Sequence, residues 1–304
     1  MTETSTETPA DQADNLDRAE PGDSDAAIET LFDAGGLAPS ARAIVAETDL
    51  ALKVARAKST AKAWFGRRLS LGHLSDRAGM PERPGRPPRP ELRMPRDMPR
   101  RSAHGPAGRF ALLHALAHIE LNAIDMTWDL VGRFAREAMP QSFFDNWVQV
   151  GLEEAKHFEM LAKRLTALGG NYGDLPAHDG LWQAAQATGH DLAARIAVVP
   201  LVLEARGLDV TPGMIDSLTA AGDQPSAAII EIIYRDEKRH VAFGAKWFRF
   251  LCERQGLPPE PTFHKLVRDN FRGPIKPPFN DRARSEAGLT PGFYKPLSAL
   301  GTSR

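Results

Sequence analysis

The sequence predicts an all-α protein built on a four-helix bundle. Four long stretches place apolar residues at helical spacing, and no segment alternates apolar and polar residues as a half-buried strand would. These stretches are residues 109–136, 141–168, 189–208 and 226–254. The glycine-rich segment 169–180 separates the second stretch from the third, so we expect a long crossover between helices 2 and 3.

The composition is that of an ordinary globular protein. The chain has 304 residues, of which 42% are hydrophobic and 25% are charged, and its formal net charge is −1. This charge gives no general attraction to nucleic acid or to acidic membranes. Cys252 is the sole cysteine, which excludes an intrachain disulfide. The acidic first residues lack the apolar core of a secretory signal, and no apolar run approaches the roughly 18 residues of a membrane span. We therefore expect a cytoplasmic protein.

Changes in composition divide the chain into four parts. We expect a disordered acidic tail (1–25), a helical and Pro/Arg-rich N-terminal extension (26–104), the bundle (105–255) and a C-terminal strap packed on the bundle (256–304). The segment 81–101 holds seven Pro and seven Arg and must be extended. We expect it to lie across the surface of the domain, while contact with phosphate groups remains the less favoured alternative.

Two prolines affect the third helix. Pro200 should bend this helix, because proline removes a backbone donor and crowds the preceding turn. Thr211 followed by Pro212 is typical of a helix cap and a first helical residue, so we expect a separate short helix to begin there. The tail contains too many turn residues to be a bundle helix. We expect it to pack over one end of the bundle and to shape access to any metals bound inside, and packing without any role in access is the favoured alternative.

Each apolar stripe of the bundle contains a carboxylate. Burial of a lone carboxylate is costly, so such a group is normally paired, protonated or bound to a metal. In order along the chain, the polar residues on the four stripes are Glu120, then Glu154 and His157, then Glu204, then Glu237 and His240.

These residues form the pattern Glu, Glu-x-x-His, Glu, Glu-x-x-His. Side chains three residues apart point the same way from a helix, so each Glu-x-x-His pair can bind one ion. A single pair usually lies on a solvated face, but two pairs and two further glutamates on apolar stripes match a dinuclear carboxylate site in a bundle core. Glu120 precedes His157 by 37 residues and Glu204 precedes His240 by 36, as two similar hairpins would produce.

Three neighbouring residues are candidates for supporting roles. Asp236 and Glu153 each immediately precede a Glu-x-x-His pair. A metal-bound histidine usually donates its second ring nitrogen to a carboxylate, so Asp236 could serve one histidine and Glu153 the other, with solvent exposure as the alternative. Tyr234 lies one turn before Glu237 and either faces the site or belongs to the core; we favour the core.

Five segments of the chain have a recognisable pattern: RFALLHALAHIELNAIDMTWDL, EEAKHF, EARGLDVTP, RDEKRHVAFG and, in the tail, FNDRARSEAGL. In these segments the sequence resembles an uncharacterised bacterial ferritin-like family named for a domain of unknown function. It extends from about Ala26 to the C-terminal end. The resemblance implies the fold of the ferritin-like di-iron carboxylate superfamily, with metal ligands at the six positions above. It also points, more distantly, to hydroxylases that act on modified transfer RNA, so an RNA substrate stays open.

Four carboxylates and two imidazoles favour iron or manganese over metals that prefer thiolate. We expect two iron ions, with two manganese ions as the alternative. The leading hypothesis is an oxygen-activating oxidoreductase or hydroxylase that uses dioxygen or peroxide, an unknown small-molecule substrate and an electron donor. The alternatives are a ferroxidase or iron-handling protein, a di-manganese catalase-like peroxide scavenger and a structural metal site. No catalytic side chain beyond the ligands is assigned, since the cofactor carries the oxidation. A homodimer is the default oligomer.

Overall fold

The computed structural model describes residues 31–74, 79–94, 97–98, 105–273 and 275–298. The segment 1–25, predicted to be disordered, lies outside them. Helices make up the regular structure of the described residues, and β pairing there is limited to an isolated parallel bridge between Leu92 and Ala177. The all-α prediction is therefore confirmed for these ranges. None of the described helices is both long enough and apolar enough to cross a bilayer.

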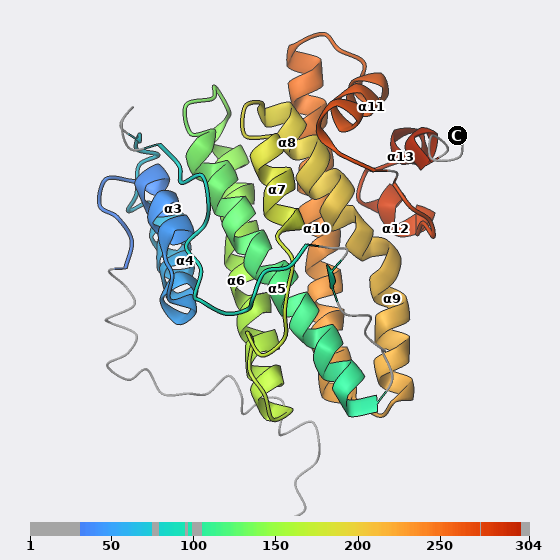
Figure 1. Cartoon of the computed structure of the whole chain (residues 1–304). Helices are drawn as coiled ribbons and strands as arrows, with labels where there is room; N and C mark the ends of the chain where they lie inside the picture. Colours follow the sequence, from blue (N-terminus) through green and yellow to red (C-terminus); the bar gives the residue numbers. More distant parts are fainter. Residues whose placement is uncertain (1–30, 75–78, 95–96, 99–104, 274, 299–304) are drawn as a thin grey trace, which may run out of the picture.

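Long helical segments lie side by side and enclose the apolar core (Figure 1). They are α5 (Gly105–Arg133), α6 (Gln141–Ala167), the run α8 (Leu192–Val198), η3 (Val199–Glu204) and α9 (Ala205–Ala220), and α10 (Gln224–Arg254). A crossover that contains α7 (Gly180–Ala187) connects α6 to α8. Helix α5 packs against α6, and α9 packs against α10. The helices begin and end within a few residues of the predicted stretches, except in the third.

Helices α3 (Leu37–Ala46) and α4 (Leu50–Phe65) cover the outer side of α5 and α6 (Figure 1). A buried ion pair joins Lys53 of α4 to Asp125 of α5. Arg86, from the Pro/Arg-rich segment, reaches the same carboxylate at 2.8 Å. The described residues of that segment have no helix of four or more residues, and the Glu82 carbonyl accepts a hydrogen bond from Trp182 of α7 at 3.0 Å. This arrangement agrees with a strap that lies across the domain.

The prediction of a separate helix at Thr211 is wrong, because Pro212 lies inside α9. A proline at this position leaves the Leu208 carbonyl without its helical donor. The side-chain amide of Asn280, in the tail, donates to that carbonyl at 3.2 Å. The third helix therefore continues through the proline, supported by a contact that is distant in sequence.

Pro200 lies within η3, a π-helical segment, so the helix is irregular where a bend was predicted. Such segments are rare and are often found at functional sites. Gly244 of α10 lies against this segment, since a Cβ at Gly244 would be 2.8 Å from the Pro200 Cβ. The absence of a side chain at Gly244 therefore lets α10 approach η3, which ends at Glu204.

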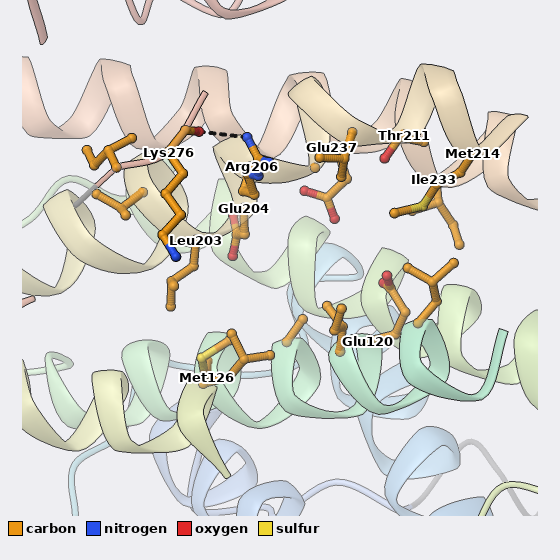
Figure 2. A pocket seen from close by; sticks show the side chains of 18 of the residues that line it. Glu120, Met126, Leu203, Glu204, Arg206, Thr211, Met214, Ile233, Glu237 and Lys276 are labelled. Carbon is orange, nitrogen blue, oxygen red and sulfur yellow. Dashed lines mark hydrogen bonds between the residues drawn. The ribbon is translucent and has the colours of Figure 1, made fainter. Parts of the chain in front are cut away.

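The tail forms short helices, α11 (Pro259–Asn270), α12 (Asp281–Glu286) and α13 (Pro291–Ser298). Phe293 of α13 packs edge-on against Phe248 of α10, with ring centroids 6.4 Å apart. The buried guanidinium of Arg284 donates to both oxygens of Asp209 on α9, at 2.8 and 2.7 Å. Arg206 of α9 donates to the Lys276 carbonyl at 2.8 Å (Figure 2). The tail is thus fixed to α9 and α10.

Candidate metal centre

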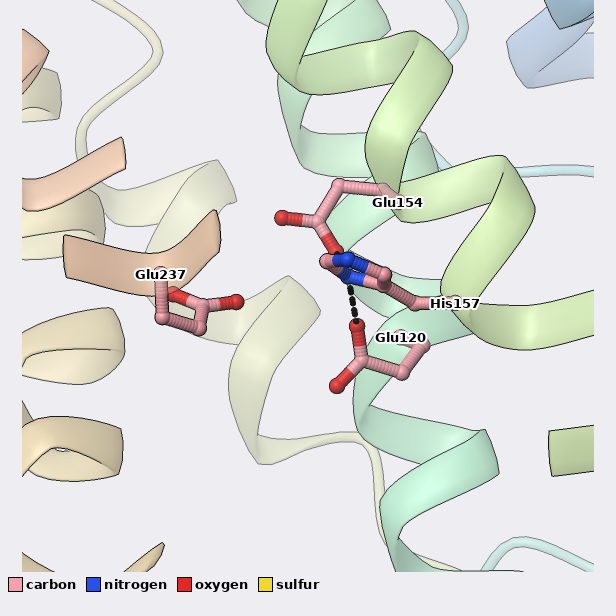
Figure 3. A group of neighbouring side chains, drawn as sticks. All are labelled: Glu120, Glu154, His157 and Glu237. Atoms are coloured by element: carbon pink, nitrogen blue, oxygen red, sulfur yellow. Dashed lines mark hydrogen bonds and ion pairs between the residues drawn. The ribbon is translucent and has the colours of Figure 1, made fainter. Parts of the chain in front are cut away.

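Carboxylate and imidazole groups from three helices meet in the core (Figure 3). One ligand-type atom from each of Glu120, Glu154, His157 and Glu237 lies within 4.8 Å of the others. Glu154 and His157 are fully buried, and Glu120 and Glu237 are nearly so. These residues come from α5, α6 and α10, as the apolar stripes predicted.

Glu154 lies between the two histidines. Its Oε2 is 3.5 Å from Nδ1 of His157, and its Oε1 is 2.9 Å from Nδ1 of His240. The two imidazole rings are 6.0 Å apart between centroids. Each histidine also has a second glutamate near Nδ1: Glu120 at 3.2 Å for His157, and Glu237 at 3.6 Å for His240. The cluster therefore has two similar halves that share Glu154.

Glu204 completes the predicted set from the third helix. Glu204 as a whole is partly exposed, but both of its carboxylate oxygens are shielded from solvent. Figure 2 shows it on the same cavity as Glu120 and Glu237. Burial, and then the neighbouring charge of Glu237, raise the pKa of Glu204 well above its ordinary value. The structure thus brings the six predicted ligands into one region.

Several ligand-type atoms of this region have no hydrogen-bond partner in the described part of the chain. They are both carboxylate oxygens of Glu204, Oε2 of Glu237, and both oxygens of Glu154 with Nδ1 of His240. The Glu154 oxygens lie 2.9 and 3.5 Å from the Nδ1 atoms of His240 and His157, but these close contacts do not have hydrogen-bond geometry. A buried acceptor without a partner costs about 1–3 kcal/mol, so native proteins rarely leave one. Cations would satisfy all of these atoms together. The oxygen and imidazole set present here therefore fits a dinuclear site for iron or manganese.

The electrostatics agree with a site that releases protons when it binds cations. Burial and the charge of Glu154 raise the pKa of Glu120 well above its usual range, and they also raise the pKa of Glu237. Burial alone would raise the pKa of Glu154, but His240 and His157 hold it below its ordinary value. A bound metal would replace the protons that the cluster otherwise retains.

Two outer carboxylates support the histidines across the helix pair. Nε2 of His157 on α6 lies 3.2 Å from Oδ2 of Asp236 on α10. Nε2 of His240 on α10 lies 2.8 Å from Oε2 of Glu153 on α6. Each ring therefore directs Nε2 to an outer carboxylate and Nδ1 to the inner glutamates, the arrangement that sets tautomer and orientation at metal sites.

Arg239 connects the two outer carboxylates and was not identified from the sequence. Its guanidinium lies 2.5 Å from Glu153 and 3.0 Å from Asp236. The sequence feature that could have identified Arg239 is its position three residues after Asp236, which places both side chains on one face of α10. Arg239 therefore helps to hold the supports of both histidines.

The other candidate residues lie apart from the cluster. The structure does not bring Tyr234 to the glutamates: its hydroxyl is 3.3 Å from Nδ2 of Asn280, and Lys238 lies over its ring. Nδ1 of His118, on α5, lies 2.8 Å from the Tyr172 hydroxyl.

A cavity of about 530 Å³ borders the cluster and was not predicted as such. Its wall includes Glu120, Glu204 and Glu237, together with mostly apolar side chains of α5, α9 and α10. Residues 271–273 and 275–276 of the tail form part of the wall. The tail therefore packs on the bundle and contributes to the wall of this cavity, while its role in access stays a prediction.

Comparison with known proteins gives a family and one relative. The model of the family described as "Protein of unknown function (DUF455)" matches residues 46–295. An uncharacterized protein of Haemophilus influenzae is 41% identical over 209 residues, which cover 67% of this chain and 73% of that protein. No solved structure matches.

Proposed function

The chain belongs to the DUF455 family of proteins of unknown function, and from its buried cluster we propose that it is a dinuclear metal enzyme of the ferritin-like type. In this proposal α5, α6, the α8–α9 run and α10 form the four-helix bundle. Glu120 and His157 are ligands of one half of the site, Glu204, Glu237 and His240 are ligands of the other, and Glu154 is shared between the halves.

The observation that carries the proposal is the set of buried ligand atoms without hydrogen-bond partners. Glu204 buries both carboxylate oxygens in this state, and Glu154 has close contacts to the two histidines that lack hydrogen-bond geometry. A structural role for Glu204 would require a partner, as Asp209 has in Arg284. The outer contacts of Glu153 and Asp236 add support, because they leave the Nδ1 atoms of both histidines directed towards the inner glutamates.

Iron is the metal that we propose, with manganese as the alternative, because the donors are hard oxygens and imidazoles. Two iron ions bound here would supply redox chemistry with dioxygen or peroxide. Residues of the chain would bind and orient the substrate, and the cavity walls would limit the access of water. An oxygen-activating oxidoreductase or hydroxylase acting on a small molecule is thus the proposed activity, and an external electron donor would complete it.

The cavity favours an organic substrate over iron handling or peroxide removal. Iron ions and peroxide are small and polar, and neither needs an apolar cavity of about 530 Å³. Small-molecule sites typically occupy about 300–1,000 Å³ and are mostly apolar with few polar groups. The ferroxidase and the di-manganese peroxide scavenger remain the alternatives, and oxygen and metal titrations distinguish them.

The test uses full-length protein purified without chelators. Iron-loaded protein would be reduced without oxygen, and its optical spectrum would be followed while oxygen is admitted. We expect about two irons per chain, from the two halves of the site, and an absorbance change that depends on oxygen. Two manganese ions with rapid peroxide consumption would instead support the scavenger. Rapid oxidation with retention of many more irons per chain would support iron handling.

A further inference from the structure

We propose that the cavity beside Glu120, Glu204 and Glu237 binds an aliphatic molecule that carries one carboxylate, and that Lys276 pairs with this carboxylate. The inference rests on the proposed function, because it names the substrate class of the same site. Three observations support it: the side chains that line the cavity, the positive charges available there and the order of the charged groups along it.

The lining favours an aliphatic ligand. Leu116 and Ala123 of α5 face the same space as Val202 and Val210 of the third helix and Ile230 of α10. Among the described residues that line the cavity, Phe271 is the one aromatic side chain. Flat rings such as nucleobases are usually held by stacking on aromatic side chains. A flexible hydrocarbon chain fits this lining better.

The available positive charge suits a single anionic group. The guanidinium of Arg206 donates to the carbonyls of Lys276 and Pro278, at 2.8 and 2.9 Å, and Arg284 is paired with Asp209. By contrast, no carboxylate of the described residues lies within ion-pair distance of Lys276 or Arg272, which also line the cavity. A polyanion such as RNA would need many such cations along a continuous surface.

The charges are arranged along the cavity from outside to inside. Lys276 is exposed, and its side chain extends from the tail towards Leu203 (Figure 2). Figure 2 shows Glu204 between Lys276 and the carboxyl groups of Glu120 and Glu237, which are buried farther inside. A ligand with its carboxylate at Lys276 would place its aliphatic part against the wall that carries the glutamates. The opposite orientation would bring its carboxylate next to the buried glutamates.

The experiment is a calorimetric titration of full-length protein with octanoate and with octanol, which has the same chain length without the charge. Metal content would be measured in the same samples, and titrations would be repeated after chelation. We expect Lys276→Gln to weaken octanoate binding by about threefold to tenfold, as for a partly exposed charge pair, and to leave octanol binding unchanged. Lys265→Gln, on an exposed face of α11 away from the cavity, should leave both unchanged.

A second variant tests the apolar part. Ile233→Trp should fill the space beside the glutamates and weaken both ligands, while circular dichroism verifies that the helices are retained. The inference would be overturned if Lys276→Gln bound octanoate as tightly as the unmodified protein and if binding were lost on chelation. That result would place the octanoate carboxylate at the metals. Failure of both ligands to bind metal-loaded protein, or binding of single-stranded RNA in their place, would also overturn the inference. Octanoate binding that depends on Lys276 in a protein that takes up no metal would support the cavity inference and contradict the proposed function.

Discussion

The Glu153 carboxylate on α6 lies 2.8 Å from Nε2 of His240 on α10. The reverse contact, from Asp236 on α10 to His157 on α6, has a distance of 3.2 Å. Each helix of the pair thus provides a histidine and the carboxylate that supports the other helix's histidine. The orientation of both histidines therefore depends on how α6 and α10 pack against each other.

Loss of either support should weaken metal binding. We predict that Glu153→Gln and Asp236→Asn each lower metal affinity by about tenfold to a hundredfold, because the supported histidine loses its fixed tautomer and orientation. Competition with a chromophoric chelator measures this affinity. Glu231→Gln, at an exposed position of α10, is the matched control and should bind as the unmodified protein does. Equal affinities in all four proteins would show that the outer carboxylates serve only the ion pairs with Arg239.

Glu204 should impose a stability cost on the metal-free protein. Its two buried oxygens have no hydrogen-bond partner among the described residues. We predict that Glu204→Met, which is similar in length, stabilises the chelated protein by about 1–3 kcal/mol while it reduces metal binding. Urea unfolding of chelated samples measures the first effect and metal analysis the second. A destabilised chelated variant would mean that Glu204 already has a favourable partner.

Close packing at Gly244 should be sensitive to one added methyl group. We predict that Gly244→Ala destabilises the protein by about 1–3 kcal/mol, because its Cβ would lie 2.8 Å from the Pro200 Cβ. A Cβ added at Gly213, inside α9, would meet none of the described residues outside its own stretch of helix within 4 Å. Gly213→Ala should therefore stabilise the protein by about 0.5–1 kcal/mol through helix propensity alone. Urea unfolding would compare the two variants, and effects of the same sign would contradict the role of packing at Gly244.

The charge of Asp223 should make stability depend on pH in the acid range. Asp223 caps α10 through the Ser226 amide and lies 2.7 Å from Arg164 of α6. Burial alone would raise the pKa of Asp223, but the contacts with Ser226 and Arg164 hold it below its ordinary value. Because the folded pKa is the lower one, the contribution is complete above the unfolded pKa of about 4 and is lost as pH falls through the folded pKa.

We therefore predict that Asp223→Asn, which retains a capping side chain, lowers the free energy of unfolding by about 1 kcal/mol at pH 7. This difference should shrink below about pH 4, as followed by urea unfolding at several pH values. Asp216→Asn, at an exposed position of α9, is the control. A difference that stays constant down to about pH 3 would indicate an effect of shape and not of charge.

The sequence was sufficient for three of the four long helices and for the residues of the cluster, because both depend on periodicity within single helices. Glu120 and Glu154 could be located because each interrupts an apolar stripe. The two outer carboxylates were also identified, but that Glu153 supports His240 and Asp236 supports His157 depends on how α6 and α10 pack together.

Features that depend on contacts distant in sequence could not be predicted. The third helix continues through Pro212, and the Leu208 carbonyl that the proline leaves without a helical donor accepts from Asn280, 72 positions away. The cavity depends on how the tail lies over α9. The role of Arg239 depends on the packing of α6 against α10, which brings both outer carboxylates to its guanidinium. In each case local propensity does not include the partner that decides the structure.

The existence of the dinuclear site is tested most directly by the metal content of full-length protein purified without chelators and then supplied with iron or manganese. We predict about two metal ions per chain. We also predict a near-complete loss in Glu154→Met, because Glu154 lies between both histidines. The control Glu159→Gln, at a half-buried position of α6 where the carboxylate pairs with Lys58 of α4, should retain both ions. Circular dichroism would verify that both variants keep their helices. Folded protein that binds neither metal, or Glu154→Met that binds two ions as before, would contradict the dinuclear site.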